Sequence, residues 1–208
     1  MRFRPAPVAC ALIAILALAA CASPGSAEIG STGQPSPTAS AVSPPTPSPA
    51  PTVDPADVTT WTITAEGIGP IKRAAAYPDA LSELTTFEAA ELCPGAVELS
   101  RDATAGVLLS LSADGTEVAT VWVAGRAGDD GVVPASPATD AGIRLGSSGE
   151  ELAAAYPDLE TVAQIGADTY GYAVGDDATG WIDFIVDGGI VTTIGSSERQ
   201  AAPREFCG

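Results

Sequence analysis

The sequence contains no histidine and only one lysine, Lys72. The absence of histidine excludes Ser-His-Asp triads, histidine-based zinc sites and the side chain that most often acts as a general base near neutral pH. A Ser-x-x-Lys dyad is also absent, because Gly69 stands three residues before Lys72. No GxxxxGK phosphate-binding loop occurs. The sequence therefore lacks the residues for the common nucleophilic and phosphoryl-transfer chemistries.

Basic residues are few, with 9 Lys and Arg against 26 Asp and Glu and a formal net charge of −17. Nucleic-acid binding requires clustered Lys and Arg side chains that neutralise phosphates, so we expect no nucleic-acid partner. Adsorption to anionic lipid through a basic patch is disfavoured for the same reason. The acidity by itself indicates a soluble, self-repelling surface and does not identify a ligand.

Acidic residues occur as three adjacent pairs, Asp129-Asp130, Glu150-Glu151 and Asp176-Asp177. Adjacent side chains do not converge on one substrate atom, and the two Asp pairs lie in Gly-flanked loops, where Asp favours turn geometry. The Glu pair suits a first helical turn, where negative charge complements the helix dipole. No EF-hand spacing ends in Glu, so calcium binding is not indicated. We expect no metal, no cofactor and no catalytic residue, with a carboxylate-dependent hydrolase as the alternative.

Long apolar runs are also scarce, and the run near the N-terminus is too short to span a bilayer. It covers residues 8–20 and follows Arg2 and Arg4, a pattern typical of an export signal. The run ends in LAAC, residues 18–21, which resembles the lipobox of bacterial lipoproteins. The resemblance implies cleavage before Cys21 and fatty acylation of that cysteine, which would anchor the protein to a membrane. An ordinary secretory signal with an incidental cysteine is the alternative.

Residues 21–56 hold nine of the 18 prolines and show no apolar periodicity. This Pro-, Ser- and Thr-rich composition builds no core and predicts a disordered tether. Removal of residues 1–20 leaves 7 basic and 26 acidic residues, a formal charge of −19, so acyl chains would have to supply the attachment. We predict a protein that is lipid-anchored at the extracytoplasmic face of the cell membrane.

Four cysteines are present, and Cys10 leaves with the signal. Because Cys21 is the acylation candidate, Cys93 and Cys207 are the only pair in the exported part. An oxidising compartment favours a disulfide between them. The alternative, a reactive Cys93 nucleophile, is disfavoured because the chain offers no histidine as its base.

Two segments of similar pattern follow the tether. The hexapeptide AAAYPD occurs twice, at residues 74–79 and 153–158, but that register aligns little else and we interpret it as coincidence. An offset of 72 to 73 residues places LSADGTEVATV from Leu111 over FIVDGGIVTTI from Phe184, and the Asp-Gly turns coincide. This pattern indicates a weak internal duplication.

Both segments contain helix signals followed by strand signals, and the first segment also has a strand signal before its helix. Pro78 suits the first turn of a helix that extends to Leu84, and residues 85–88 could cap a second short helix. A capping-box spacing at residues 147–151 starts a helix that Pro157 ends. Strands are predicted at residues 61–63, 96–99, 107–111, 117–123, 170–174, 181–186 and 190–194.

These signals predict an α+β fold of two tandem units, residues 57–135 and 136–208. Each unit is expected to pack a short helical segment on a roughly three-stranded antiparallel sheet. The GIGPI and AGIRLG lead-ins and the Asp-Gly hairpins resemble the beta-lactamase inhibitor proteins and, more distantly, the small outer-membrane assembly lipoproteins of the SmpA type. The sequence departs from them because the expected disulfide joins the two units and no obvious cluster of exposed aromatic residues is present.

Tyr170 and Tyr172 are the predicted exposed surface for a ligand or partner, together with Asp176 and Asp177 in the adjacent GDDATG loop. The three tryptophans are interpreted as core, which is the commoner role of aromatic residues in strands. We therefore predict a non-enzymatic binding or interaction module for an envelope protein or small ligand. A carboxylate-dependent envelope hydrolase and a structural cell-wall spacer are the alternatives.

Overall fold

The computed structural model describes residues 52–207, which belong to one compact unit, Ser48–Gly208. The predicted signal peptide, the acylation candidate Cys21 and residues 21–51 of the tether lie outside the described residues. Within residues 52–207, no helix has both the length and the apolar character needed to cross a membrane.

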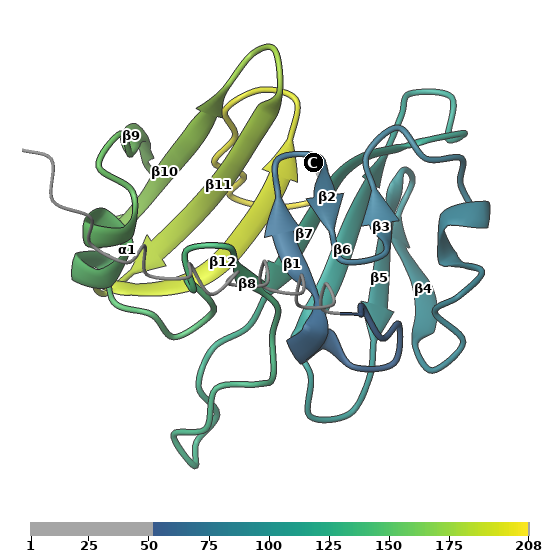
Figure 1. Cartoon of the computed structure of the whole chain (residues 1–208), viewed down its shortest axis with the longest axis horizontal. Coiled ribbons are helices and arrows are strands. Elements are labelled where there is room, and N and C mark those ends of the chain that lie inside the picture. The colour runs from purple at the N-terminus through teal and green to yellow at the C-terminus, as the bar shows by residue number, and fades with distance from the viewer. Residues whose placement is uncertain (1–51, 208) are drawn as a thin grey trace, which may run out of the picture. The chain divides into compact units, whose positions relative to one another are not determined.

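Strands dominate this part of the chain, and the prediction of tandem α+β units is wrong. Its secondary structure comprises twelve strands, one α-helix, α1 (Gly149–Ala155), and the 3-10 turns η1 (Val58–Thr60) and η2 (Asp79–Leu81). The strands form a four-stranded and an eight-stranded sheet (Figure 1). The fold is therefore mostly β.

The larger sheet consists of two four-stranded antiparallel meanders that meet at their last strands, β7 and β12 (Figure 1). At this junction Val123 pairs with Ile194 and Trp122 with Gly195. The sheet is continuous between the two segments that the sequence distinguishes. The first meander contains β4 (Glu88–Cys93), β5 (Ala96–Ser100), β6 (Gly106–Leu111) and β7 (Val118–Ala124); the second contains β9 (Glu160–Gln164), β10 (Thr169–Asp176), β11 (Gly180–Asp187) and β12 (Ile190–Ser197).

The two Asp-Gly hairpins are confirmed. Gly115 has a φ of 73° between β6 and β7, and Gly188 has a φ of 57° between β11 and β12. Residues other than glycine rarely adopt this left-handed backbone conformation, which explains why glycine follows aspartate at both turns. The hairpins pair antiparallel as expected.

The helix predicted from the capping-box spacing is also confirmed as α1. Ser148 is its N-cap and accepts a hydrogen bond from the Glu151 N–H, while the Glu151 carboxylate accepts one from the Ser148 N–H. The cap residue at the other end is Tyr156, which directly precedes Pro157. The local signals agree with one another here, and the helix forms where they place it.

The two helices predicted in the first segment do not form. Only the single 3-10 turn η2 follows Pro78. Pro78 makes no side-chain capping hydrogen bond, and none of the residues of η2 is buried. Leu84 is nevertheless buried in the core and Leu81 packs against it, so these apolar contacts form here without a longer helix. Glu88, which we had placed in a second helix, instead begins β4 and pairs with Ser100 of β5. Sheet pairing thus overrides a weak local capping signal.

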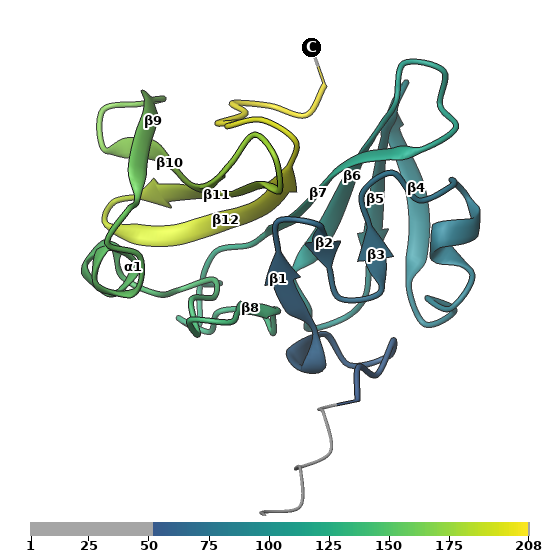
Figure 2. The same ribbon diagram turned by 45° about the horizontal axis from the view of Figure 1, so that its top comes forward.

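The smaller sheet covers one face of the larger one near β7 and β12 (Figure 2). Its strands are β3 (Ile71–Lys72), β2 (Gly67–Ile68), β1 (Thr62–Thr64) and β8 (Ala138–Thr139), in that spatial order. Trp61, Ile63 and Ile68 belong to the same buried cluster as Val121 and Val123 of β7. This cluster is the hydrophobic core, and all three tryptophans are buried, as predicted.

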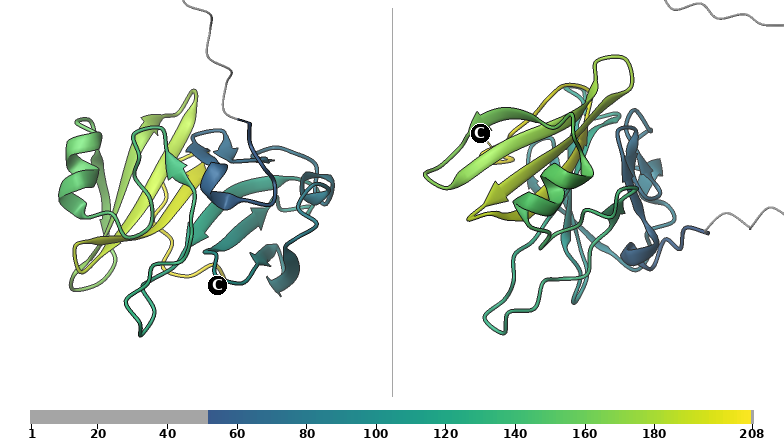
Figure 3. Two further views of the ribbon diagram at one scale, coloured as in Figure 1. Left: turned by 60° about the horizontal axis from the view of Figure 1, so that its bottom comes forward. Right: turned by 60° about the vertical axis from the view of Figure 1, so that its left-hand side comes forward.

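The C-terminal segment, residues 198–207, crosses the opposite face of the larger sheet (Figures 2 and 3). Phe206 meets the Trp122 ring edge-on at a centroid distance of 5.8 Å. A disulfide joins Cys207 to Cys93 at the end of β4, as the sequence predicts. The chain end is therefore fastened to the first meander.

Candidate functional site

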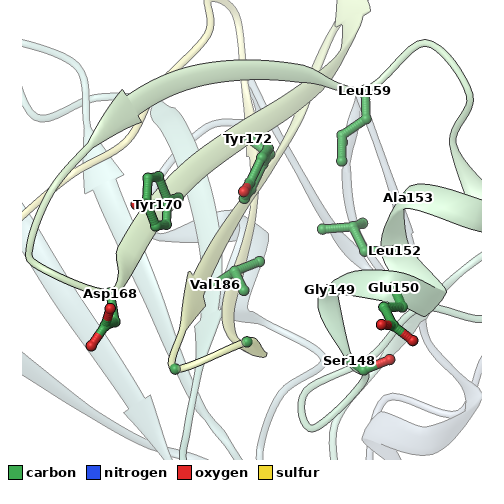
Figure 4. A pocket seen from close by; sticks show the side chains of 12 residues that line it. Ser148, Gly149, Glu150, Leu152, Ala153, Leu159, Asp168, Tyr170, Tyr172 and Val186 are labelled. Carbon is green, nitrogen blue, oxygen red and sulfur yellow. The ribbon is translucent and has the colours of Figure 1, made fainter.

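A pocket of about 830 Å³ lies between α1 and the face formed by β10 and β11 (Figure 4). Its apolar lining includes Leu152 of α1, Val186 of β11 and the rings of Tyr170 and Tyr172. The volume falls within the range of small-molecule sites, which are typically apolar with a few polar groups. This pocket contains the two tyrosines that the sequence singled out.

The alternation of β10 directs both tyrosines toward the pocket. Successive side chains of a strand point to opposite faces, so Tyr170 and Tyr172 share one face and Gly171 faces the other. A Cβ atom at Gly171 would collide with Ala202 of the C-terminal segment. The ring centroids of the two tyrosines are 6.4 Å apart, with a tilt of 38°. They form a paired aromatic wall.

The opposite wall is α1, which is fixed to the β11–β12 turn. The Gly149 N–H donates to the Gly189 carbonyl at 2.8 Å, and the Val191 N–H donates to the Ser147 carbonyl at 2.8 Å. Leu152 is 1% exposed and anchors the helix in the core. The position of the helix, and hence the width of the pocket, is set by these backbone contacts.

The only charged residues among those that line the pocket are acidic. Glu150 lies on α1, and Asp168 lies just before β10 (Figure 4). Asp187, next to the lining residue Gly188, accepts a hydrogen bond from Thr169 and pairs with Arg126. Those two contacts, the Thr169 bond first, lower the pKa of the Asp187 carboxyl group. The charge of Asp187 is thus compensated, while the pocket itself carries two carboxylates.

Asp176 and Asp177, which we had grouped with the tyrosines, do not line this pocket. Asp176 accepts hydrogen bonds from the Thr179 N–H at 2.8 Å and the Ala178 N–H at 2.9 Å, and these bonds help to lower its pKa. Asp177 accepts one from the Trp181 Nε1–H at 3.1 Å. Both carboxylates stabilise the β10–β11 turn at the other end of the strands.

The two charged residues of the pocket were missed as site residues. Asp168 precedes Tyr170 by two positions and Tyr172 by four, so the period-two spacing could have placed it on the same face. Glu150 was recognised only as a first-turn residue. Its position opposite β10 depends on the packing of α1, which no local pattern reveals.

No protein-family model and no curated protein matches this sequence.

Metal-ligating residues do not cluster in residues 52–207. No group of three or more His, Cys, Asp or Glu residues in this range is placed to hold a metal ion. Carboxyl groups that act as general acids are typically tuned by burial, and the one buried acidic residue in this range is Asp183. Asp183 does not line the pocket and is bonded to the C-terminal segment.

Proposed function

We propose that this protein is a lipid-anchored binding module of the cell envelope and that its ligand or partner occupies the pocket between α1 and the β10–β11 face. The observation that carries the proposal is the paired wall of Tyr170 and Tyr172 beside an apolar floor in a pocket of about 830 Å³. Tyrosine supplies a large contact area at a low cost in conformational entropy, which favours it at recognition sites.

Binding is favoured over catalysis by the residues that line the pocket. They include no cysteine, lysine or histidine, and the hydroxyl group of Ser148, the N-cap of α1, is hydrogen-bonded within the capping box. Glu150 and Asp168 are exposed and make no hydrogen bond that would orient them for proton transfer. These groups fit recognition of a ligand better than its transformation.

The location follows from the N-terminal sequence. The LAAC motif supports acylation of Cys21, and a Cys93–Cys207 disulfide is the form expected in an oxidising, extracytoplasmic compartment. Mass analysis of protein purified from membranes tests this part. We expect a mature chain that begins at an acylated Cys21, and an intact leader or an unmodified cysteine would contradict it.

Affinity capture from envelope extracts tests the site. Tyr172→Ala removes half of the aromatic wall and is expected to abolish capture of the bound component. Leu92→Ala is the matched control, because Leu92 is a large apolar side chain that is 44% exposed on β4 and does not line the pocket. Equal capture by wild type and Tyr172→Ala, with both folded, would overturn the assignment of the pocket.

A further inference from the structure

The charged residues that line the pocket have one sign. Glu150 and Asp168 come from opposite walls, and no Lys or Arg lines the pocket. The nearby Arg126 is paired with Asp187. The whole chain adds to this field with a formal charge of −17. A concave site lined by charges of one sign attracts ligands of the other sign and repels those of its own.

Three backbone donors at the start of α1 are already used within the protein. The Gly149 N–H donates to the Gly189 carbonyl, and the Glu151 N–H donates to the Ser148 side chain. The Ser148 N–H in turn donates to the Glu151 carboxylate at 2.7 Å. These donors are satisfied within the protein, so they are not free to hold an anion.

The apolar and aromatic surfaces define the rest of the ligand. The rings of Tyr170 and Tyr172 can receive a cation over their faces, an attraction that strengthens as water is excluded. Leu152 of the opposite wall and Val186 of β11 also line the pocket and offer contact to methylene or ring carbons.

We infer that the pocket selects a ligand in which an apolar body carries an ammonium or guanidinium group. The source of this group is either a free organic amine or the side chain of a Lys or Arg residue in a peptide. The inference depends on the proposed function, because it names the ligand class of the same site.

Calorimetric titration of the full chain, purified from membranes in a nonionic detergent, tests this selectivity. The probes are 2-phenylethylamine, its uncharged analogue 2-phenylethanol and the anion phenylacetate. We expect the amine to bind about five- to tenfold more tightly than the alcohol, with phenylacetate weakest. The preference should shrink at about 1 M salt, because exposed charges are then screened.

Two double variants separate charge selection from general binding. Glu150→Gln with Asp168→Asn should bind the amine and the alcohol equally. Glu83→Gln with Glu117→Gln removes two exposed carboxylates that lie outside the pocket and should keep the preference for the amine.

A pair of tripeptides identifies the source of the cation. If an acetylated Leu-Arg-Leu amide binds more tightly than the amine and than its citrulline counterpart, the ligand is a peptide. If instead 2-phenylethylamine binds more tightly than the Arg tripeptide, and still more tightly than 2-phenylethanol, the ligand is a small amine.

The failure of this inference is distinguishable from the failure of the proposed function. If the wild type bound the amine and the alcohol with equal affinity and Tyr172→Ala bound neither, charge selection would be overturned. The assignment of the binding site would then still stand. Absence of binding by all the probes would also overturn the inference, while the capture result with Tyr172→Ala would still decide the proposed function.

Discussion

The carboxylate of Asp183 accepts a hydrogen bond from the backbone N–H of Ala201, with 2.7 Å between Oδ1 and N. Its second oxygen lies 2.5 Å from the Ser197 hydroxyl oxygen, which is also 2.6 Å from the Arg199 carbonyl oxygen. Asp183 is 0% exposed. This buried residue therefore ties the C-terminal segment to β11, on the face of the sheet opposite the core.

Asp183 makes stability depend on pH. Burial raises its pKa to about 6, although the bonds from Ser197 and Ala201 and the charge of Arg73 oppose the shift. Because this folded-state pKa exceeds the ordinary aspartate value of 3.8, the folded state binds the proton more tightly than the unfolded state. Protonation of Asp183 therefore stabilises the folded state at low pH, by at most about 3 kcal/mol. This stabilisation is lost as the pH rises through about 6.

Denaturant unfolding at about pH 5 and about pH 7.5 measures this effect. We expect a larger free energy of unfolding for the wild type at the lower pH. In Asp183→Asn, which cannot titrate, the difference should be much smaller. An identical pH dependence in the two proteins would show that Asp183 is not the group responsible.

Removal of the disulfide should destabilise the fold. Cys93 and Cys207 are separated by 114 residues in sequence, and a cross-link over such a loop restricts the unfolded chain strongly. The double variant Cys93→Ser with Cys207→Ser should lose about 4 kcal/mol of unfolding free energy. Reduced wild type serves as the control and should unfold at the same denaturant midpoint. A loss below about 1 kcal/mol would contradict the role given to this bond.

The cap of α1 should matter for both stability and binding. Ser148→Ala removes the hydroxyl group that accepts from the Glu151 N–H, and such changes cost about 1 kcal/mol. Ser82→Ala is the control, because Ser82 is exposed and makes no side-chain hydrogen bond. Since α1 forms one wall of the pocket, ligand affinity should fall together with thermal stability only in Ser148→Ala. Equal behaviour of the two variants would argue against a structural role for the cap.

Gly195 provides space for Trp122 across the junction of the two meanders. A Cβ atom at Gly195 would collide with the indole ring, and Trp122 is 2% exposed and cannot move into solvent. Gly195→Ala should destabilise the protein by about 1–3 kcal/mol, measured by denaturant unfolding. Gly149→Ala is the control, because its nearest neighbour would be at an ordinary distance of 3.6 Å. If the two variants were equally stable, the packing at the junction would be looser than described.

Several elements were predictable because local and tertiary signals agree. The Asp-Gly hairpins and the Ser148 cap each follow from a few neighbouring residues. The strand β4 was not predictable, because Glu88 and the residues before it resemble a helix start. Its conformation depends on pairing with Ser100, twelve residues further along the chain.

The site was predictable only along β10. The spacing of Tyr170 and Tyr172 places them on one face, but the opposing Glu150 requires knowledge of where α1 packs. Asp183 illustrates the same limit. It alternates with Ile182 and Phe184, so a two-layer fold would expose it, and only the C-terminal segment that crosses this face explains its burial.

The central claim is that the pocket between α1 and the β10–β11 face is where this protein contacts its ligand. Site-specific photocrosslinking in intact cells tests it most directly, with a photoreactive residue in place of Ala153, which is exposed and lines the pocket. The same residue at Ala113, exposed in the β6–β7 turn, is the control. We expect a discrete mass increase at position 153 that disappears with Tyr172→Ala. The absence of an adduct there, or the same adduct at position 113, would contradict the claim.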